Sequence, residues 1–180
     1  MKEDKRFLWQ DENYGMEILH MRWYQVLARL QDIFVKASMN FFSNRGFSYV
    51  PLPVTTGSIS SPMGLGSGSL PLKIQLKGQE VYLADSMQFL LEYGCRLTEG
   101  GCFYLMPSFR GEDTDERHLS QFFHSEAEMP GGLEDIMRLA EDYIAALSGQ
   151  MLDGCRAEIL ELAGDIRHLE KMAAGVPVSR

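Results

Sequence analysis

Little cysteine, little basic charge and no long apolar run characterise this 180-residue sequence. Cys95, Cys102 and Cys155 have no CxxC or Cys/His ligand spacing, so they fit reduced cytosolic thiols better than a disulfide framework or a zinc site. With 17 Lys and Arg against 25 Asp and Glu, the net charge of −8 argues against a nucleic-acid coat but leaves room for a local phosphate site. The charged N-terminal stretch is no signal peptide, and no apolar run approaches the roughly 20 residues of a membrane span. We therefore expect a cytoplasmic protein without a membrane partner.

The apolar residues that are present follow helical and strand periodicities. The chain of 180 residues is long enough for one domain with a hydrophobic core, and 45% of its residues are hydrophobic. The patterns before the centre predict a long helix, a short strand, a hairpin, and a second helix with Asp85 or Ser86 as its cap. The ranges of these elements are Met16–Asn44, Phe47–Pro53, Leu72–Leu76 with Val81–Ala84, and Met87–Leu97. Two more amphipathic helices are predicted, at Leu133–Ser148 and from Asp153 or Gly154 to near Gly175.

Between these elements, Thr55–Pro71 is rich in glycine and serine and predicts a long mobile loop. Loops of this length in compact domains are either functional or disordered, so a lid over a site and a plain flexible connection both stay open. The loop lacks the GxxxxGK[ST] pattern and is therefore no P-loop.

The centre of the chain predicts a hairpin with an unusual charge pattern. Its strands are expected at Cys102–Glu112 and Gln121–Met129. Because side chains alternate along a strand, one face is mostly apolar and is expected against a core. That face carries Phe103, Leu105, Phe109, Phe123, Ser125, Ala127 and Met129. The other face carries Ser108, Arg110, Glu112, Phe122, His124, Glu126 and Glu128. This gathering of charge favours a functional site, and a solvated outer face is the alternative.

The same hairpin resembles motif 2 of the class II aminoacyl-tRNA synthetases, in the aspartyl/asparaginyl subclass. The residues that carry the likeness are Phe109-Arg110-x-Glu112, Arg117-His118-Leu119-x-Gln121-Phe122 and Glu126-x-Glu128. They are closest to asparaginyl-tRNA synthetase and the related archaeal-type asparagine synthetase. The segment at about 27–53 resembles motif 1, the dimer interface of the family, and Tyr82–Glu92 resembles its substrate-binding segment. The resemblance implies an α+β fold with an antiparallel sheet flanked by helices.

The resemblance also implies roles for individual residues. Arg110 would be the catalytic arginine at the α-phosphate of ATP, and Phe122 would stack on adenine. Glu112 would accept from the adenine amine or hold Arg110, and Arg117 or His118 would contact the terminal phosphates. The amino acid's ammonium or side-chain amide would be held by Gln88, Glu92 and Glu126.

From the residues alone, one limit applies to these roles. Gln88 and Glu92 lie four apart on one helix face with Leu91, where an ordinary solvent-facing polar pair is the alternative. The resemblance also implies that no general base is required, because the attacking group is already a carboxylate.

Several features depart from the family pattern. The loop from Arg110 to Arg117 is one residue shorter, Ser60–Gly66 replaces a Glu-Gly-Ala loop, and His124 stands where an uncharged residue is usual. No motif 3 follows and no anticodon-binding barrel precedes, so we expect residues 1–180 to be one C-terminally truncated catalytic domain, with motif 2 at about 103–129. ATP and Mg²⁺ are the implied cofactors, and the metal ligands are expected mainly in the missing C-terminal part.

Three hypotheses about function follow. The first is an asparaginyl-type ligase that activates an aspartate- or asparagine-like carboxylate as an acyl-adenylate, without an anticodon domain. The second is a fragment of a true asparagine-tRNA ligase, and the third is a non-catalytic dimerising paralogue. A homodimer through motif 1 is expected, and tRNA stays open as a partner although no anticodon domain supports it. The retention of Arg110, Glu112 and Phe122 together argues against the third hypothesis.

Overall fold

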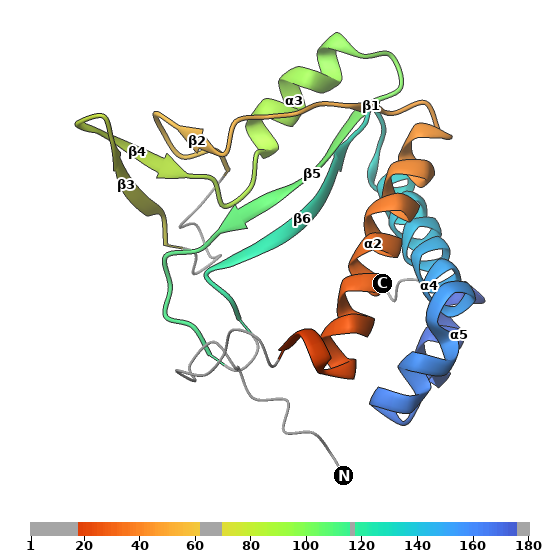
Figure 1. Cartoon of the computed structure of the whole chain (residues 1–180). Coiled ribbons are helices and arrows are strands. Elements are labelled where there is room, and N and C mark those ends of the chain that lie inside the picture. Colours follow the sequence, from red (N-terminus) through yellow and green to blue (C-terminus); the bar gives the residue numbers. More distant parts are fainter. Residues whose placement is uncertain (1–17, 62–69, 116–117, 176–180) are drawn as a thin grey trace. The chain divides into compact units, whose positions relative to one another are not determined.

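The computed structural model describes residues 18–61, 70–115 and 118–175 (Figure 1). The chain separates into two compact units. The first combines the chain up to Ala37 with the chain from Met137 onward, and the second is Ser38–Ile136. The division falls inside the helices α2 (Arg22–Ser43) and α4 (Leu133–Ala163).

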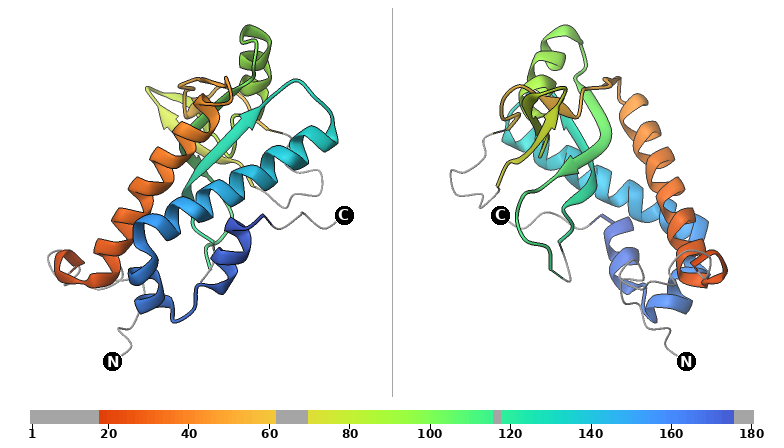
Figure 2. Two further views of the ribbon diagram at one scale, coloured as in Figure 1. Left: turned by 90° about the vertical axis from the view of Figure 1, so that its right-hand side faces the viewer. Right: turned by 60° about the vertical axis from the view of Figure 1, so that its left-hand side comes forward.

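The elements in the described part of the first unit are all helical (Figure 2). A short 3-10 turn, η2 (Ile18–His20), precedes α2, and α5 (Arg167–Ala173) follows α4. Two ion pairs join α2 to α4. Arg29 lies 2.8 Å from Glu158, and Arg22 lies 3.5 Å from Glu161. Exposed pairs of this kind contribute little to stability, so the burial of apolar residues such as Val26 and Leu152 must hold these helices together.

The division into two helices expected near Asp153 or Gly154 is confirmed as a kink rather than a gap. Two helices meet inside α4 at Cys155, whose torsions are non-helical (φ −145°, ψ 23°), whereas the stretch after Ser148 stays helical. A Cβ on Gly154 would lie 2.5 Å from Ile33 Cδ1, so the glycine allows α2 and α4 to approach closely.

The described residues of the second unit form two three-stranded sheets. In the first, β1 (Ser48–Tyr49) pairs in parallel with β5 (Cys102–Phe109), which pairs antiparallel with β6 (Gln121–Glu128). In the second, β4 (Gln79–Leu83) lies between β2 (Thr55–Thr56) and β3 (Leu72–Leu76), antiparallel to both. The expected antiparallel pairing is confirmed for both hairpins, whereas the parallel pairing of β1 was not predicted.

Turn chemistry explains where several of these strands end. The strand predicted at Phe47–Pro53 pairs only at Ser48 and Tyr49, because the prolines that follow have no N–H for a ladder. The predicted hairpin of β3 and β4 is confirmed, and both residues of its turn have positive φ, 51° at Lys77 and 79° at Gly78. Such a turn matches the natural twist of a two-residue hairpin. The predicted loop from Thr55 begins instead as β2, and its residues 62–69 lie outside the described part of the chain.

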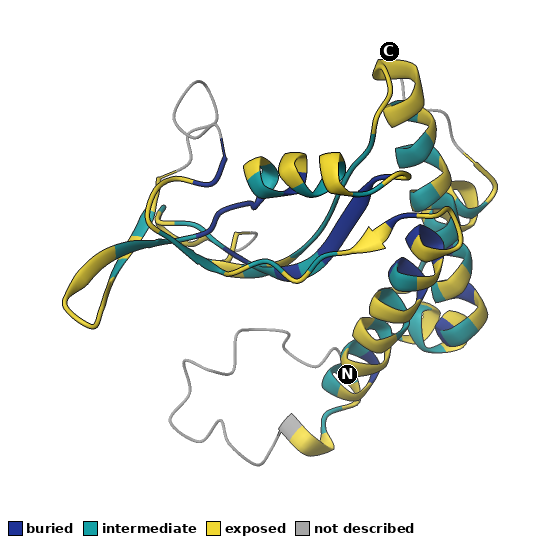
Figure 3. Ribbon diagram, turned by 90° about the horizontal axis from the view of Figure 1, so that it is seen from above, coloured by how far each residue is buried: buried dark blue, intermediate teal, exposed yellow. Residues whose placement is uncertain are grey.

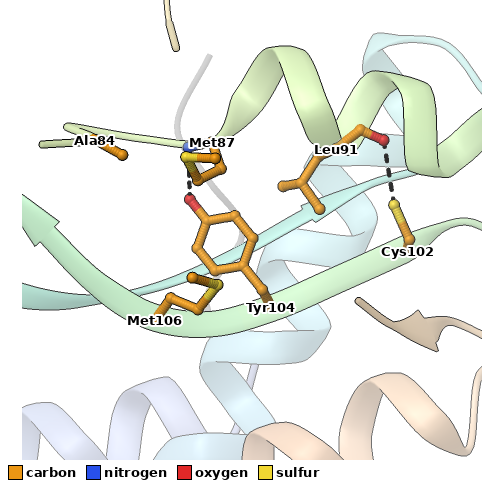
Figure 4. Packing of buried hydrophobic residues seen from close by; sticks show 6 residues of the cluster. All are labelled: Ala84, Met87, Leu91, Cys102, Tyr104 and Met106. Atoms are coloured by element: carbon orange, nitrogen blue, oxygen red, sulfur yellow. Dashed lines mark hydrogen bonds between the residues drawn. The ribbon is translucent and has the colours of Figure 1, made fainter. Parts of the chain in front are cut away.

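Helix α3 (Gln88–Leu97) covers the start of β5, and Figure 3 shows the buried strand beneath it. The core cluster between them consists of Ala84, Met87, Leu91, Cys102, Tyr104 and Met106 (Figure 4). The Tyr104 hydroxyl accepts a hydrogen bond from the backbone N–H of Met87 at 2.9 Å, and the Cys102 thiol donates to the carbonyl of Leu91 at 3.2 Å. Burial raises the pKa of Cys102 to about 11, which keeps it a thiol and a donor.

The start of α3 differs in detail from the expected cap. Met87 occupies the N-cap position and its side chain makes no capping bond. The Ser86 hydroxyl accepts a hydrogen bond from the backbone N–H of Gln88 at 3.1 Å. Ser86, one of the two residues expected as the cap, therefore satisfies an N–H of the first turn that has no partner within the helix. Asp85 contacts other groups, described below.

We expect Tyr104→Phe to lower the free energy of unfolding by about 1–3 kcal/mol, because the buried N–H of Met87 would lose its acceptor. Tyr93→Phe is the matched control, since Tyr93 is 67% exposed on α3, and it should change stability by less than about 0.5 kcal/mol. Urea unfolding of both variants measures the difference. Equal stabilities would show that this hydrogen bond does not hold α3 on β5.

The apolar face of the hairpin is only partly in a core, contrary to expectation. Phe103 is fully buried and stacks on Phe42 of α2 at 4.8 Å, with Tyr49 edge-on at 5.4 Å. Phe123, on the same face of the neighbouring strand, is 67% exposed. The extended cluster of buried residues lies on the opposite face, which also carries the charges.

Candidate active site

The pairing register places the polar residues of β6 beside the buried residues of β5. Ser108 pairs with Phe122, Met106 with His124, Tyr104 with Glu126, and Cys102 with Glu128. Residues that pair across two strands share a face, so the charged face of the hairpin is the one that α3 covers. The side chains of His124 and Glu126 are only about one quarter exposed, at 28% and 27%. The alternative of a solvated outer face is therefore wrong for this part of β6.

Arg110 follows directly after β5 and is held at both its backbone and its side chain. Its N–H donates to the carbonyl of Ser120 at 2.9 Å, which extends the hairpin one step beyond the strand. Its guanidinium donates through Nη1 to Asp85 Oδ2 at 3.1 Å and lies 5.6 Å over the ring of Phe122. The Ser61 hydroxyl donates to the same oxygen of Asp85. Arg110 is thus fixed beside an aromatic ring, with a charge-assisted bond that sets its orientation.

Asp85 is a site residue that the sequence analysis missed. It was interpreted as a helix cap, yet its side chain is buried, with 4% of the residue exposed. Its Oδ2 accepts hydrogen bonds from both Arg110 and Ser61. A carboxylate is rarely buried to this extent without a cationic partner. The position of Asp85 directly after an apolar strand was the only local signal, and its partners are 24 and 25 residues away.

The surroundings of Glu126 and Glu128 on β6 disfavour the ionised form of both carboxylates. Glu126 Oε1 accepts from the Ser86 hydroxyl at 2.6 Å. Burial raises the pKa of Glu126, nearby Asp85 adds to this, and the hydrogen bond from Ser86 opposes it. Burial likewise raises the pKa of Glu128, with repulsion from Glu92 and Glu126. A cationic ligand group placed here would offset the cost of these carboxylates.

Three buried carboxylate oxygens have no hydrogen-bond partner among the described residues. They are Asp85 Oδ1, Glu112 Oε2 and Glu126 Oε2. Buried acceptors are nearly always satisfied, since leaving one unpaired costs about 1–3 kcal/mol. Water or the donor groups of a ligand can satisfy acceptors of this kind.

His124 makes contacts to three sides. Its Nδ1 lies 2.9 Å from the hydroxyl of Ser108 and 3.8 Å from Glu126 Oε2, and its ring lies edge-on to Phe122 at 4.9 Å. Burial lowers the pKa of His124, and the charge of Arg110 lowers it further, while Asp85 acts in the opposite direction. The neutral imidazole is therefore favoured.

The remaining predicted residues lie less centrally. Leu91 points into the core at 1% exposure, whereas Gln88 and Glu92 lie on a more exposed edge of α3, with Gln88 Nε2 3.4 Å from Glu92 Oε1. The three therefore do not present one common surface to a ligand. His118 lies in the exposed loop after β5 and its ring contacts Asp115 at 2.8 Å. Arg117 falls outside the described residues.

Comparison with known proteins identifies a matching family. Residues 11–175 match the family described as tRNA synthetases class II (D, K and N). The chain belongs to this family. Because the match spans most of the sequence, it confirms the resemblance drawn from motif 2 and the class II synthetase fold.

Solved structures of class II synthetases share the fold at low sequence identity. The asparaginyl-tRNA synthetase of Pyrococcus horikoshii, complexed with asparaginyl-adenylate, is 23% identical with a TM-score of 0.73, over 82% of this chain and 33% of that one. The Entamoeba histolytica asparaginyl-tRNA synthetase, also with asparaginyl-adenylate, is 21% identical with a TM-score of 0.67, over 89% and 34%. The chain thus spans about a third of the length of these synthetases.

Two further findings concern metal ligands and membrane spans. In the described part of the chain, no group of three or more His, Cys, Asp or Glu side chains is arranged to hold a metal ion. None of the helices within the described ranges is long and apolar enough to cross a membrane.

Proposed function

We propose that this chain carries the ATP- and amino-acid-binding part of a ligase that activates an aspartate- or asparagine-like carboxylate as an acyl-adenylate. In that step a carboxylate oxygen forms a bond to the α-phosphorus of ATP, and the bond to the pyrophosphate oxygen breaks. Negative charge gathers at the α-phosphate, so a fixed guanidinium is the group that the reaction most needs. Arg110 is proposed as that catalytic group.

The observation that carries the proposal is the fixed trio of Arg110, Asp85 and Phe122. Asp85 orients the guanidinium at 3.1 Å, and the aromatic ring lies 5.6 Å beneath it. A flat ring beside a cation suits a nucleotide, whose base stacks while its phosphates meet the charge. Glu112, whose Oε2 is buried and has no partner among the described residues, is proposed to accept from the adenine amine.

The amino-acid half of the proposed site adjoins this trio. The ligand's ammonium or amide donor would bind Glu126 Oε2, with Glu92 and Gln88 at the open edge of α3. Asp85 joins the two halves, because it bonds Arg110 and lies close enough to Glu126 to affect its pKa. This connection favours a substrate that carries its donor group close to the reacting carboxylate, as an α-amino acid does.

Class II synthetases generally use ATP with Mg²⁺. The described residues do not fit a metal site, because no three candidate ligands are grouped, and no step is assigned to the ion. Arg117 and His118 are proposed for the terminal phosphates. The described His118 is exposed beside Asp115, so this role would require the loop after β5 to rearrange.

The proposal is tested by ATP–pyrophosphate exchange, measured on this chain and on the full reading frame that contains it. We expect exchange that depends on an amino acid, strongest with asparagine or aspartate. Omitting the amino acid is the control, since ATP hydrolysis alone gives no exchange. If no amino acid or related acid supports exchange with either protein, the proposal is wrong.

The acyl acceptor is a separate question from activation. A tRNA acceptor would make the protein part of an asparagine-tRNA ligase, whereas ammonia or another amine would make it a biosynthetic ligase. Homodimerisation through motif 1 and a cytoplasmic location stay predictions alongside these. A non-catalytic paralogue is the weakest hypothesis, because it would keep buried, unpartnered acceptors at a cost and without a ligand.

A further inference from the structure

His124 stands between the two halves of the proposed site, yet neither half requires it. Its ring supports Phe122 edge-on at 4.9 Å on the nucleotide side. Its Nδ1 lies 3.8 Å from Glu126 Oε2 on the amino-acid side. A side chain in this position can affect one half in response to a change at the other.

The contact with Ser108 favours a neutral ring. Ser108 is 1% exposed, and its hydroxyl proton needs an acceptor. His124 Nδ1, at 2.9 Å, accepts it only when the ring is neutral and carries its proton on Nε2. Burial and the charge of Arg110 favour the same neutral form by lowering the pKa of His124.

Protonation would turn Nδ1 from an acceptor into a donor. The nearest carboxylate oxygen is then Glu126 Oε2, which has no hydrogen-bond partner among the described residues. Three charged residues surround the ring. Arg110, at the end of β5, opposes its protonation, and Asp85, before α3, favours it. The third, Glu126, lies on the same strand as His124. Glu92 of α3 and Glu128 lie beyond Glu126 and add negative charge there.

We propose that His124 is a positioning residue that controls Glu126. The neutral ring leaves Glu126 Oε2 to the ammonium or amide donor of the amino acid, and the protonated ring binds that oxygen itself. The inference rests on the proposed function, because it assigns Glu126 to the amino acid. His124 thereby makes amino-acid affinity dependent on pH, while ATP binding depends on it only through Phe122.

The sign of the effect follows from competition between one proton and one ligand. Above the pKa of His124 the affinity is constant, and below it the affinity falls by up to about tenfold per pH unit. Glu126 also titrates, with a raised pKa, and its protonation would weaken binding as well. Loss of affinity in acid is therefore informative only as a difference between the wild type and a variant that lacks the histidine.

The variant His124→Gln supplies that difference. Its amide oxygen can accept from Ser108, but it does not titrate. Calorimetry of L-asparagine and L-aspartate binding, from about pH 8 to about pH 5, compares it with the wild type on the full chain. We expect equal affinities within about twofold at pH 8, and a variant that binds up to about tenfold more tightly one unit below the pKa of His124. Superposed curves would overturn the inference.

A second measurement does not depend on catalysis or on a substitution that affects folding. Linkage is reciprocal, so a ligand that binds Glu126 must lower the pKa of His124. NMR of the histidine Cε1–H signals follows this titration with and without saturating L-asparagine, and the signal absent from His124→Gln identifies the residue. Ligand binding with an unchanged pKa of His124 overturns the inference and leaves the proposed function standing. Absence of binding by any amino acid overturns both.

Discussion

Replacing Arg110 with lysine is expected to slow amino-acid-dependent ATP–pyrophosphate exchange by about 10²–10³-fold, and alanine by at least as much. Lysine keeps the positive charge but loses the planar guanidinium, which bonds Asp85 and is proposed to bind a phosphate at the same time. The loss should appear mainly in kcat, because the guanidinium is proposed to act on charge that develops in the transition state. The Kd for the amino acid should change much less.

Alanine at position 110 needs a stability control. It would leave Asp85 buried without its cationic partner, which typically costs about 3–5 kcal/mol. Thermal unfolding of both variants separates this from catalysis, since the lysine variant retains a cation for Asp85. Arg96→Lys, at the exposed end of α3, is the matched substitution and should leave exchange unchanged. Full exchange by Arg110→Lys would remove Arg110 from its catalytic role.

How much of the site could be predicted depends on whether the signal was local. Strand alternation placed Arg110, Phe122, His124 and Glu126 on one face, and the register confirms that β6 carries the last three together. The hairpin of β3 and β4 was equally accessible, because its turn residues and alternation lie within a dozen positions. These features depend on neighbours in the sequence.

The features that were missed depend on partners far along the chain. Asp85 became a site residue only because Ser61 and Arg110 meet it in the fold. The close approach of Gly154 to the side chain of Ile33, more than a hundred residues earlier, likewise has no local signal. In both cases the local pattern was compatible with a simpler role, and tertiary packing gave the residue another.

The largest stability effect is expected at Phe103, on the face of the hairpin that was expected against a core. Phe103→Ala should lower the free energy of unfolding by about 3–5 kcal/mol, because it removes a fully buried ring. The ring stacks on Phe42 at 4.8 Å and meets Tyr49 edge-on at 5.4 Å, so both aromatic contacts would be lost with it. Urea unfolding measures the change.

Phe123→Ala is the decisive comparison, because it makes the same substitution on the same face one strand away. Phe123 is 67% exposed, and its truncation should cost less than about 1 kcal/mol. Alternation along the strands gives the two rings the same expected environment, and the packing of Phe42 and Tyr49 against Phe103 separates their costs. Equal losses in the two variants would mean that a partner covers Phe123 in solution, and chemical cross-linking of the wild type would then show an oligomer.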